Sequence, residues 1–226
     1  MTNLNRHSVL VAVPAYNAAS HLEELISRLQ VYVCPTNLLM IDDGSTDGTL
    51  DIIREHNLTH ISFEHNRGKG AALCAAFDYA LLHGYRSVLT LDADLQHSPE
   101  EIPQFYALDD GCRLVLGTRR IRGGNMPFSR RLSNNLTSII VSIFFTRRVR
   151  DSQSGFRLIP TSLLRAIELR ATDFDLESEM LFKAGMVGCD VAEAEISTLY
   201  GGRVSYIRPL HDTGRFIRQI WRRVWA

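Results

Sequence analysis

The stretch "SVLTLDADLQHSPEEI" (Ser87–Ile102) joins an apolar run to two aspartates that stand one residue apart. The apolar run is typical of a strand buried on both faces, and Asp92 and Asp94 follow directly where that strand ends. A helix is predicted next, from an N-cap, a proline at the first helical position and a capping-box acid: Ser98, Pro99 and Glu101. The stretch therefore predicts one strand–loop–helix unit of an α/β fold, with carboxylates in the loop.

The same alternation extends through the first half of the chain. Strands are expected at 8–14, 38–42, 60–65, 87–91 and 113–118, and helices at 20–30, 50–56 and 68–84. Ser20 and Glu23 stand at capping-box spacing, and Gly84 suits the residue after a helix. Such alternation predicts an α/β domain with a mostly parallel central sheet and helices on both faces. Ligands bind such sheets at the carboxyl ends of the strands.

Length and composition predict a single domain covering residues 1–226. The apolar content of 45% is enough for a full core. The four cysteines show no C-x-x-C spacing, so neither a disulfide framework nor a zinc site is expected. The apolar run near the N-terminus is too brief for a signal peptide, and residues 136–145 are about half as long as a spanning helix. A cytoplasmic location is expected.

The net charge of zero hides an asymmetry. Residues 1–112 carry 6 Lys and Arg against 15 Asp and Glu, whereas residues 113–226 carry 19 against 10. Arginine outnumbers lysine 23 to 2, and arginine suits bidentate phosphate contact. The basic half is either a solvated face or the binding side for an anionic partner, such as phosphate groups or an acidic membrane surface. Nucleic acid is not expected as a partner.

The two aspartates favour a metal site over a plain turn. Carboxylates at a buried strand end repel each other and lose hydration, and a divalent cation offsets both effects. If the strand pleat continues through Ala93, Asp92 and Asp94 point the same way, and Gln96 adds a neutral oxygen at the same spacing. Oxygen ligands of this kind suit Mg²⁺ or Mn²⁺ bound to a diphosphate. An Asx-capped turn without metal is the simpler alternative.

Six ordered blocks carry a resemblance to a known family: "VAVPAYNAASHLEEL", "MIDDGSTDGT", "NRGKGAAL", "LTLDADLQHSPEEIP", "GTRR" and "DSQSGFRLIP". Together they resemble the family 2 glycosyltransferases, in particular the branch that transfers sugars to dolichyl or polyprenyl phosphate. The resemblance implies a GT-A fold, a nucleotide-diphosphate sugar as donor, a lipid phosphate as acceptor, Mg²⁺ or Mn²⁺ as cofactor, and inversion at the anomeric carbon. It also implies a nucleotide-sugar-binding half (1–118) and an acceptor-binding, membrane-proximal half (119–226).

The resemblance also implies roles for individual residues. The nucleotide-sugar side would be formed by Pro14, Tyr16, Ile41, Asp42, Asp43, Lys69, Asp92, Ala93 and Arg203. The metal ligands would be Asp92, Asp94 and Gln96, and the acceptor side would include Ser154, Gly155 and Arg157. The catalytic candidates are Asp94, Arg119, Glu177 and Glu179, and one of the two glutamates would face the site. Tyr200 and Tyr206 stand where mannosyl-transferring members have basic residues, so GDP-mannose and UDP-sugars both remain open as donors.

Two other functions compete with transfer to a lipid phosphate. A family 2 enzyme acting on a saccharide or lipid hydroxyl would need a base, and Glu177 or Glu179 would supply it. A catalytically silent nucleotide-sugar-binding subunit is the non-enzymatic alternative, although Asp92 and Asp94 are both present. Residues 130–150 and 213–226 mix arginine with apolar side chains, which predicts interfacial helices and peripheral contact with the cytoplasmic face of an anionic membrane. Packing on the core or a dimer face is the alternative, and the oligomeric state is open.

Overall fold

The computed structural model describes residues 8–119, 149–152, 154–170 and 176–197. The two predicted interfacial helices and Arg203 lie outside these residues. Within the described part of the chain, no helix is both long and apolar enough to cross a membrane.

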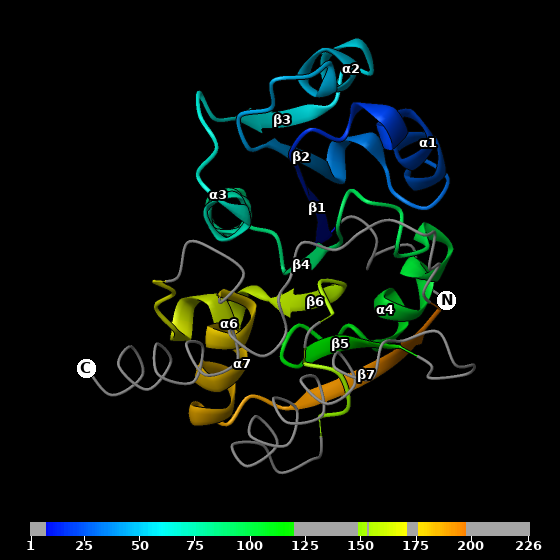
Figure 1. Ribbon diagram of the computed structural model, residues 1–226. Coiled ribbons are helices and arrows are strands. Elements are labelled where there is room, and N and C mark those ends of the chain that lie inside the picture. The colour runs from blue at the N-terminus through cyan, green and yellow to red at the C-terminus, as the bar shows by residue number, and fades with distance from the viewer. Residues whose placement is uncertain (1–7, 120–148, 153, 171–175, 198–226) are drawn as a thin grey trace, which may run out of the picture.

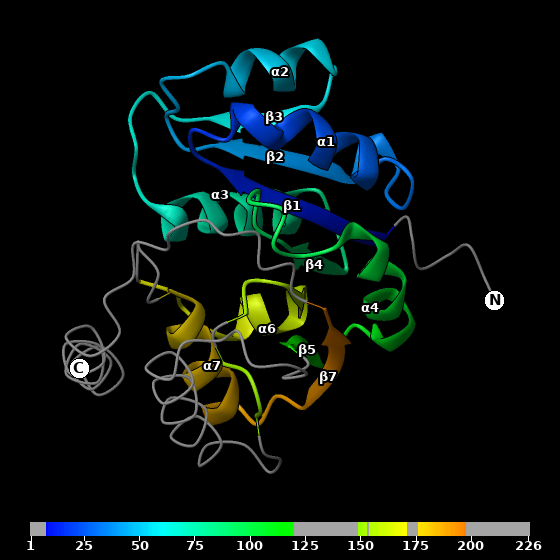
Figure 2. The same cartoon turned by 45° about the vertical axis from the view of Figure 1, so that its right-hand side comes forward.

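Seven strands form one sheet in the order β3-β2-β1-β4-β6-β5-β7 (Figure 1). The strands are β1 (Val9–Ala15), β2 (Leu38–Asp42), β3 (Thr59–Ser62), β4 (Ser87–Thr90), β5 (Leu114–Arg119), β6 (Arg157–Pro160) and β7 (Val191–Ile196). Strands β1, β2, β3 and β4 pair in parallel, and so do β5 and β7. Figure 2 shows β1 and β2 running side by side along their length.

Strand β6 is the exception to the parallel pattern. It lies between β4 and β5 and pairs antiparallel with both. Since β6 runs against its two neighbours, β4 and β5 point the same way and end at the same edge of the sheet. The expected sheet, mostly parallel, is confirmed, and β6 and β7 are additions that the sequence did not reveal.

Helices cover both faces of the sheet, as predicted. They are α1 (Ala19–Leu29), α2 (Thr49–Glu55), α3 (Lys69–Leu82), α4 (Ile102–Leu108), α6 (Thr161–Ala166) and α7 (Leu176–Met186), with 3₁₀ turns η2 (Pro35–Asn37) and η3 (Pro99–Glu101). One core cluster joins the sheet to α1, α2 and α4. A second cluster joins the opposite face to α3, α6 and α7, and Figure 1 shows the two groups of helices on either side.

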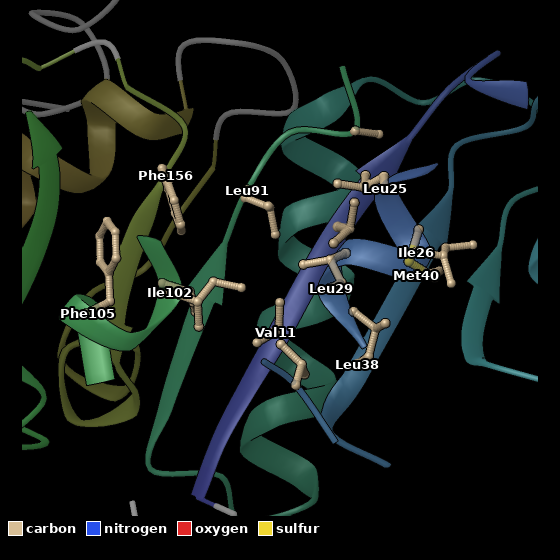
Figure 3. Packing of buried hydrophobic residues seen from close by; sticks show 14 of the residues in the cluster. Val11, Leu25, Ile26, Leu29, Leu38, Met40, Leu91, Ile102, Phe105 and Phe156 are labelled. Carbon is tan, nitrogen blue, oxygen red and sulfur yellow. The ribbon is translucent and has the colours of Figure 1, made fainter. Parts of the chain in front are cut away.

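The first core cluster shows why α1 packs where it does. Leu22, Leu25, Ile26 and Leu29 recur at helical spacing and are fully buried. Their side chains meet Val11 and other apolar residues of β1 and β2 (Figure 3). Burying one such side chain contributes about 1.5–3 kcal/mol, so this stripe fixes the helix against the sheet.

The two predicted capping boxes are wrong. Helix α1 begins at Ala19, and its first free N–H groups are bound by the loop before α2. The N–H of Ala18 donates to Thr49 Oγ1 at 2.8 Å, and that of Ala19 donates to Asp47 Oδ2 at 3.2 Å. These residues lie about thirty positions away, so tertiary contacts replace the local cap.

The helix start at Pro99 is in the predicted place but is held differently. Ser98 contacts the carboxylate of Glu100 and accepts a hydrogen bond from Arg28 at 3.1 Å. Glu101 Oε1 accepts the N–H and the hydroxyl of Ser197 at 2.7 and 2.8 Å. Both side chains therefore link separate elements. The prediction for Gly84 is confirmed, because it follows α3 with a left-handed φ of 72°.

Candidate active site

The predicted site residues converge on one edge of the sheet. Strands β1, β2, β4 and β5 all end there, which brings Tyr16, Asp43, Asp92 and Arg119 to the same side. Since β6 runs in the opposite direction, the residues just before it arrive at this edge too, and these include Gly155. The reversed strand therefore brings the block predicted for the acceptor side next to the residues predicted for the nucleotide-sugar side.

The first strand end offers an exposed aromatic ring. Tyr16 follows β1 and is 50% exposed, whereas Ile41 is fully buried in β2 beside half-buried Pro14. Asn17, with a φ of 50°, ties this loop to the next one by a hydrogen bond from its own N–H to Ser45 Oγ at 3.0 Å. Tyr16 can thus contact a ligand, whereas Ile41 belongs to the core.

Asp42 is engaged by its own loop. Its Oδ1 accepts the N–H of Ser45 at 3.1 Å, and its Oδ2 accepts the hydroxyl of Ser62 at 2.9 Å. The side chain is almost fully buried. Its described contacts shape the turn after β2 and leave ligand binding to its neighbours.

Asp43 organises the approach to α3. Its two oxygens accept the N–H groups of Arg67 and Gly68 at 2.8 and 3.0 Å. Gly68 has a φ of 91°, a conformation that favours glycine, and Lys69 follows it as the first residue of α3. Asp43 therefore positions Lys69.

Lys69 lies between two carboxylates. Its Nζ is 2.5 Å from Asp92 Oδ1 and 2.9 Å from Glu177 Oε1, so it joins β4 to α7. Only 17% of the Lys69 side chain is exposed. Burial alone lowers the pKa of Lys69, but the charges of Asp92 and Glu177 raise it above its ordinary value. Burial likewise raises the pKa of Asp92, but Lys69, His97 and Arg157 together hold it below its usual range.

Asp94 lies in a turn and not in a continued strand. Strand β4 ends at Thr90, Ala93 and Asp94 form a turn, and Leu95 has a left-handed φ of 59°. Asp94 Oδ1 accepts the N–H of Gln96 at 3.0 Å, which stabilises the turn locally. The expectation that the pleat continues through Ala93 is therefore wrong.

The chemistry of this loop fits a hard divalent cation. Asp92, Asp94 and Gln96 supply carboxylate and amide oxygens, the ligand types that Mg²⁺ and Mn²⁺ prefer. In the described residues no three acids, histidines or cysteines gather into a metal cluster. Asp92 is 28% exposed and paired with an ammonium, which shows that this position attracts positive charge.

His97 is a site residue that sequence reasoning missed. It is 5% exposed, its ring lies 5.5 Å from that of Phe156, and its buried Nδ1 has no partner in the described part of the chain. Burial lowers the pKa of His97, although the charges of Asp92 and Asp94 oppose the shift. Its place directly after Gln96 was the available signal.

Gly155 is required by its contact with Asp92. A Cβ at Gly155 would lie 2.6 Å from Asp92 Oδ2, closer than atoms can approach. Thr90 Oγ1 donates to the carbonyl of Gly155 at 2.8 Å and fixes the loop at this distance. The acceptor-side block and the D-x-D loop are thus in direct contact.

Arg157 is buried inside this block. Its guanidinium donates to the backbone carbonyls of Ser154, Ser152 and Glu177 at 2.6–2.7 Å. Burial lowers its pKa despite nearby acids. Ser154 is also buried, and its Oγ accepts the N–H of Phe156 at 3.3 Å. The described contacts of both residues are structural.

Arg119, at the end of β5, is held by a residue that the sequence did not single out. Its Nε and Nη2 donate to Asp151 Oδ2 and Oδ1 at 2.6 and 3.0 Å. Asp151 is buried, and the Arg119 side chain is 18% exposed. The pair fixes the direction of the guanidinium at the carboxyl end of β5.

The two candidate glutamates of α7 differ in direction. Glu177 points to Lys69 and the site. Glu179 is 3% exposed and accepts the N–H of Arg170 with both oxygens, at 3.2 and 3.0 Å, and Lys183 Nζ at 2.8 Å. Of the two, Glu177 is therefore the residue that faces the site.

The sheet gathers acidic and basic side chains at its carboxyl edge, where α/β sheets bind their ligands. The family model for "Glycosyl transferase family 2" matches residues 10–168, and the chain belongs to this family.

Several similar proteins are named for reactions of polyprenyl or dolichyl phosphates. The chain is 30% identical over 200 residues to an undecaprenyl-phosphate mannosyltransferase of Micrococcus luteus, covering 84% of this chain and 82% of that one. It is 30% identical over 202 residues to a polyprenol monophosphomannose synthase of Mycolicibacterium smegmatis, covering 83% and 76%. A UDP-N-acetylglucosamine–dolichyl-phosphate N-acetylglucosaminyltransferase of Methanococcus voltae is 29% identical, covering 85% and 86%.

The fold matches a solved structure. Glucosyl-3-phosphoglycerate synthase from Mycobacterium tuberculosis, in complex with Mn²⁺, UDP and glucosyl-3-phosphoglycerate, superposes with a TM-score of 0.68 at 21% identity. The match covers 95% of this chain and 77% of that one. It supports the GT-A fold for the chain.

Proposed function

We propose that this glycosyltransferase moves a sugar from a nucleotide-diphosphate sugar to a polyprenyl phosphate, with inversion at the anomeric carbon and with a divalent cation. Two of the similar proteins are named for transfer to undecaprenyl or dolichyl phosphate, and the solved structure of similar fold holds Mn²⁺ and UDP. The cation would be held by Asp92, Asp94 and Gln96. When bound, it would neutralise negative charge on the departing nucleoside diphosphate.

One observation carries the choice of acceptor. A hydroxyl acceptor needs a base to take its proton, whereas a lipid phosphate is already ionised. The carboxylate of Glu177 is paired with Lys69, and that of Glu179 is bound by Lys183 and by the backbone of Arg170. The candidate bases are thus committed to cations, which favours the phosphate.

The chain's own residues then bind and orient the substrates. Tyr16 is exposed for contact with the base or ribose, and Asp43 and Lys69 order the loop beside it. Arg119, held by Asp151, would face a phosphate group of donor or acceptor and stabilise its negative charge. Glu177 would keep Lys69 in place beside Asp92.

The acceptor can be tested by a matched pair of lipids. A panel of GDP- and UDP-sugars, with Mn²⁺, is first screened for thermal stabilisation, because a ligand that binds the native state raises the melting temperature. The selected donor is then offered to a short polyprenyl phosphate and to the corresponding polyprenol. We expect product with the phosphate alone, and opposite anomeric configurations in donor and product by NMR. Product with the polyprenol would favour the hydroxyl-acceptor function.

Membrane contact is proposed on the sequence of residues 130–150 and 213–226, which lie outside the described residues. Arginines beside aromatic and aliphatic side chains favour reversible binding to an anionic bilayer surface. Co-sedimentation with anionic liposomes should weaken as salt rises and fall when residues 213–226 are deleted. Equal sedimentation with neutral liposomes would contradict this.

A further inference from the structure

Lys69 places a positive charge between two carboxylates of the candidate site. It is one of the chain's two lysines, and its ammonium lies against Asp92 of the D-x-D loop and against Glu177 of α7. The side chains of these three residues are 17%, 28% and 14% exposed, so solvent screens their charges only partly. Without the ammonium, two carboxylates from separate elements would face the same partly buried space.

The Asp92 carboxylate has little room for another partner. Its Oδ1 is 2.5 Å from Lys69 Nζ, and its Oδ2 faces the backbone of Gly155, where a methyl group would come within 2.6 Å. A divalent cation that approaches Asp92 must therefore share the carboxylate with Lys69 or displace it.

We propose that Lys69 is the resident counter-cation of the candidate metal site. It holds Asp92 and Glu177 together when no divalent cation is bound, and it competes with that cation for the Asp92 carboxylate. Glu177 is then a positioning residue: 2.9 Å from Nζ, it offers Lys69 a second anion and weakens its hold on Asp92. The inference rests on the metal dependence proposed above.

This arrangement gives two substitutions of opposite sign. In Lys69→Met the competitor is absent and two acids remain, so the metal-free protein is less stable and binds the divalent cation more tightly. In Glu177→Gln, Asp92 is the one of the two acids beside Lys69 that keeps its charge. The ammonium then holds Asp92 more strongly, so the divalent cation binds more weakly. A residue that only contacts the donor diphosphate would produce neither change.

The matched control is the other lysine. Lys183 Nζ lies 2.8 Å from Glu179 Oε1, with side-chain exposures of 16% and 3%. This lysine–glutamate pair is at least as buried as the first and lies within α7, the helix of Glu177. The described contacts of Lys183 are with Glu179 and the carbonyl of Glu168. Lys183→Met should lower stability without changing the affinity for the cation.

The test is a titration of Mn²⁺ into chelator-treated protein, alone and with the nucleoside diphosphate that the donor panel selects. Free Mn²⁺ is measured by electron paramagnetic resonance, and the melting temperature is followed in parallel. We expect a dissociation constant roughly tenfold lower in Lys69→Met, about 1.4 kcal/mol. We expect it severalfold higher in Glu177→Gln and unchanged in Lys183→Met.

Each result decides the proposal. If the wild-type protein binds Mn²⁺ and Lys69→Met binds it equally well or more weakly, the counter-cation role is overturned. The metal dependence in the proposed function then still stands. If Lys69→Met does not fold, Glu177→Gln carries the test, and equal or tighter binding there overturns it. If the wild-type protein binds no Mn²⁺ under either condition, the metal dependence itself fails, and this inference fails with it.

Discussion

Arg119 and Asp151 form a two-point ion pair that joins the end of β5 to the chain 32 positions later, with Nε–Oδ2 at 2.6 Å and Nη2–Oδ1 at 3.0 Å. An aspartate held in this way fixes the direction of the guanidinium. Because its direction is already fixed, Arg119 would lose little side-chain freedom on binding a ligand.

Asp151→Asn should separate positioning from stability. The amide keeps one acceptor and loses the charge, so we expect kcat/KM to fall on the order of tenfold, about 1.4 kcal/mol. Asp109→Asn is the control, since Asp109 pairs with Arg86 at 2.6 Å and is buried elsewhere. Both variants should lose stability in urea, and only Asp151→Asn should lose activity. Equal kinetics in the two variants would rule out a positioning role.

Gly155→Ala should inactivate the site through Asp92. The added methyl group would force either the carboxylate or the loop to move, because the Thr90 hydroxyl holds the loop at its carbonyl. Donor binding and transfer should both drop sharply. Gly48→Ala is the comparison, because its Cβ would meet only Ala19 at 3.9 Å. Thermal shift with the donor measures the difference, and normal donor binding in Gly155→Ala would refute the proposed crowding.

Glu179→Gln and Glu177→Gln should fail in different ways. Glu179 is deeply buried beside Lys183, so neutralising it leaves an unpaired ammonium and lowers the free energy of unfolding by about 3 kcal/mol. Glu177→Gln should keep the fold and lower the rate modestly, without removing a rising limb from the pH–rate profile. Loss of that limb with intact donor binding would show that Glu177 is a base and that the acceptor is a hydroxyl.

Stability at low pH should depend on Glu100. Hydrogen bonds from Arg28, which join η3 to α1, lower its pKa from 4.5 to about 2. Because the folded-state value is depressed, this stabilisation is complete above about pH 4.5 and is lost as the pH falls toward 2. Glu100 is 44% exposed, so the contribution is about 0.5 kcal/mol. Urea unfolding of wild type and Glu100→Gln should differ at pH 7 and converge near pH 2.

Asp94→Asn should abolish transfer and leave the fold intact. One amide oxygen is a poor substitute for an anionic ligand of a hard cation. Asp94 is not a core residue, and its Oδ1 accepts the N–H of Gln96, which an amide oxygen can also accept. Circular dichroism should be unchanged while transfer is lost. Full activity in this variant, or in chelator-treated enzyme, would exclude the metal role.

The sequence predicted the edge of the sheet better than the contacts along it. Apolar runs ending in acids located β2 and β4, because such patterns depend on neighbouring residues alone. Strand β6 was missed because "RLIP" is four residues long and its partners are distant. Residues two positions apart on a helix point in directions that differ by about 200°, so only one of Glu177 and Glu179 can face the site. Which one does so depends on how α7 is rotated against the sheet, and the sequence does not give that rotation. Lys69 was placed in the site, but its bridge to Glu177 needed the fold.

The reversed strand also sets an order for folding during synthesis. Strand β5 pairs with β6 and β7, and β4 meets β5 only through β6. The ribosome must therefore make the 41 residues that follow Arg119, up to Pro160, before β5 can join the sheet, which takes roughly 2–8 s at ordinary rates of translation. During that interval the nascent chain presents β4 with an unpaired edge, the kind of surface that invites aggregation. Chaperone dependence in the cell should thus be concentrated in nascent chains of about 120–160 residues.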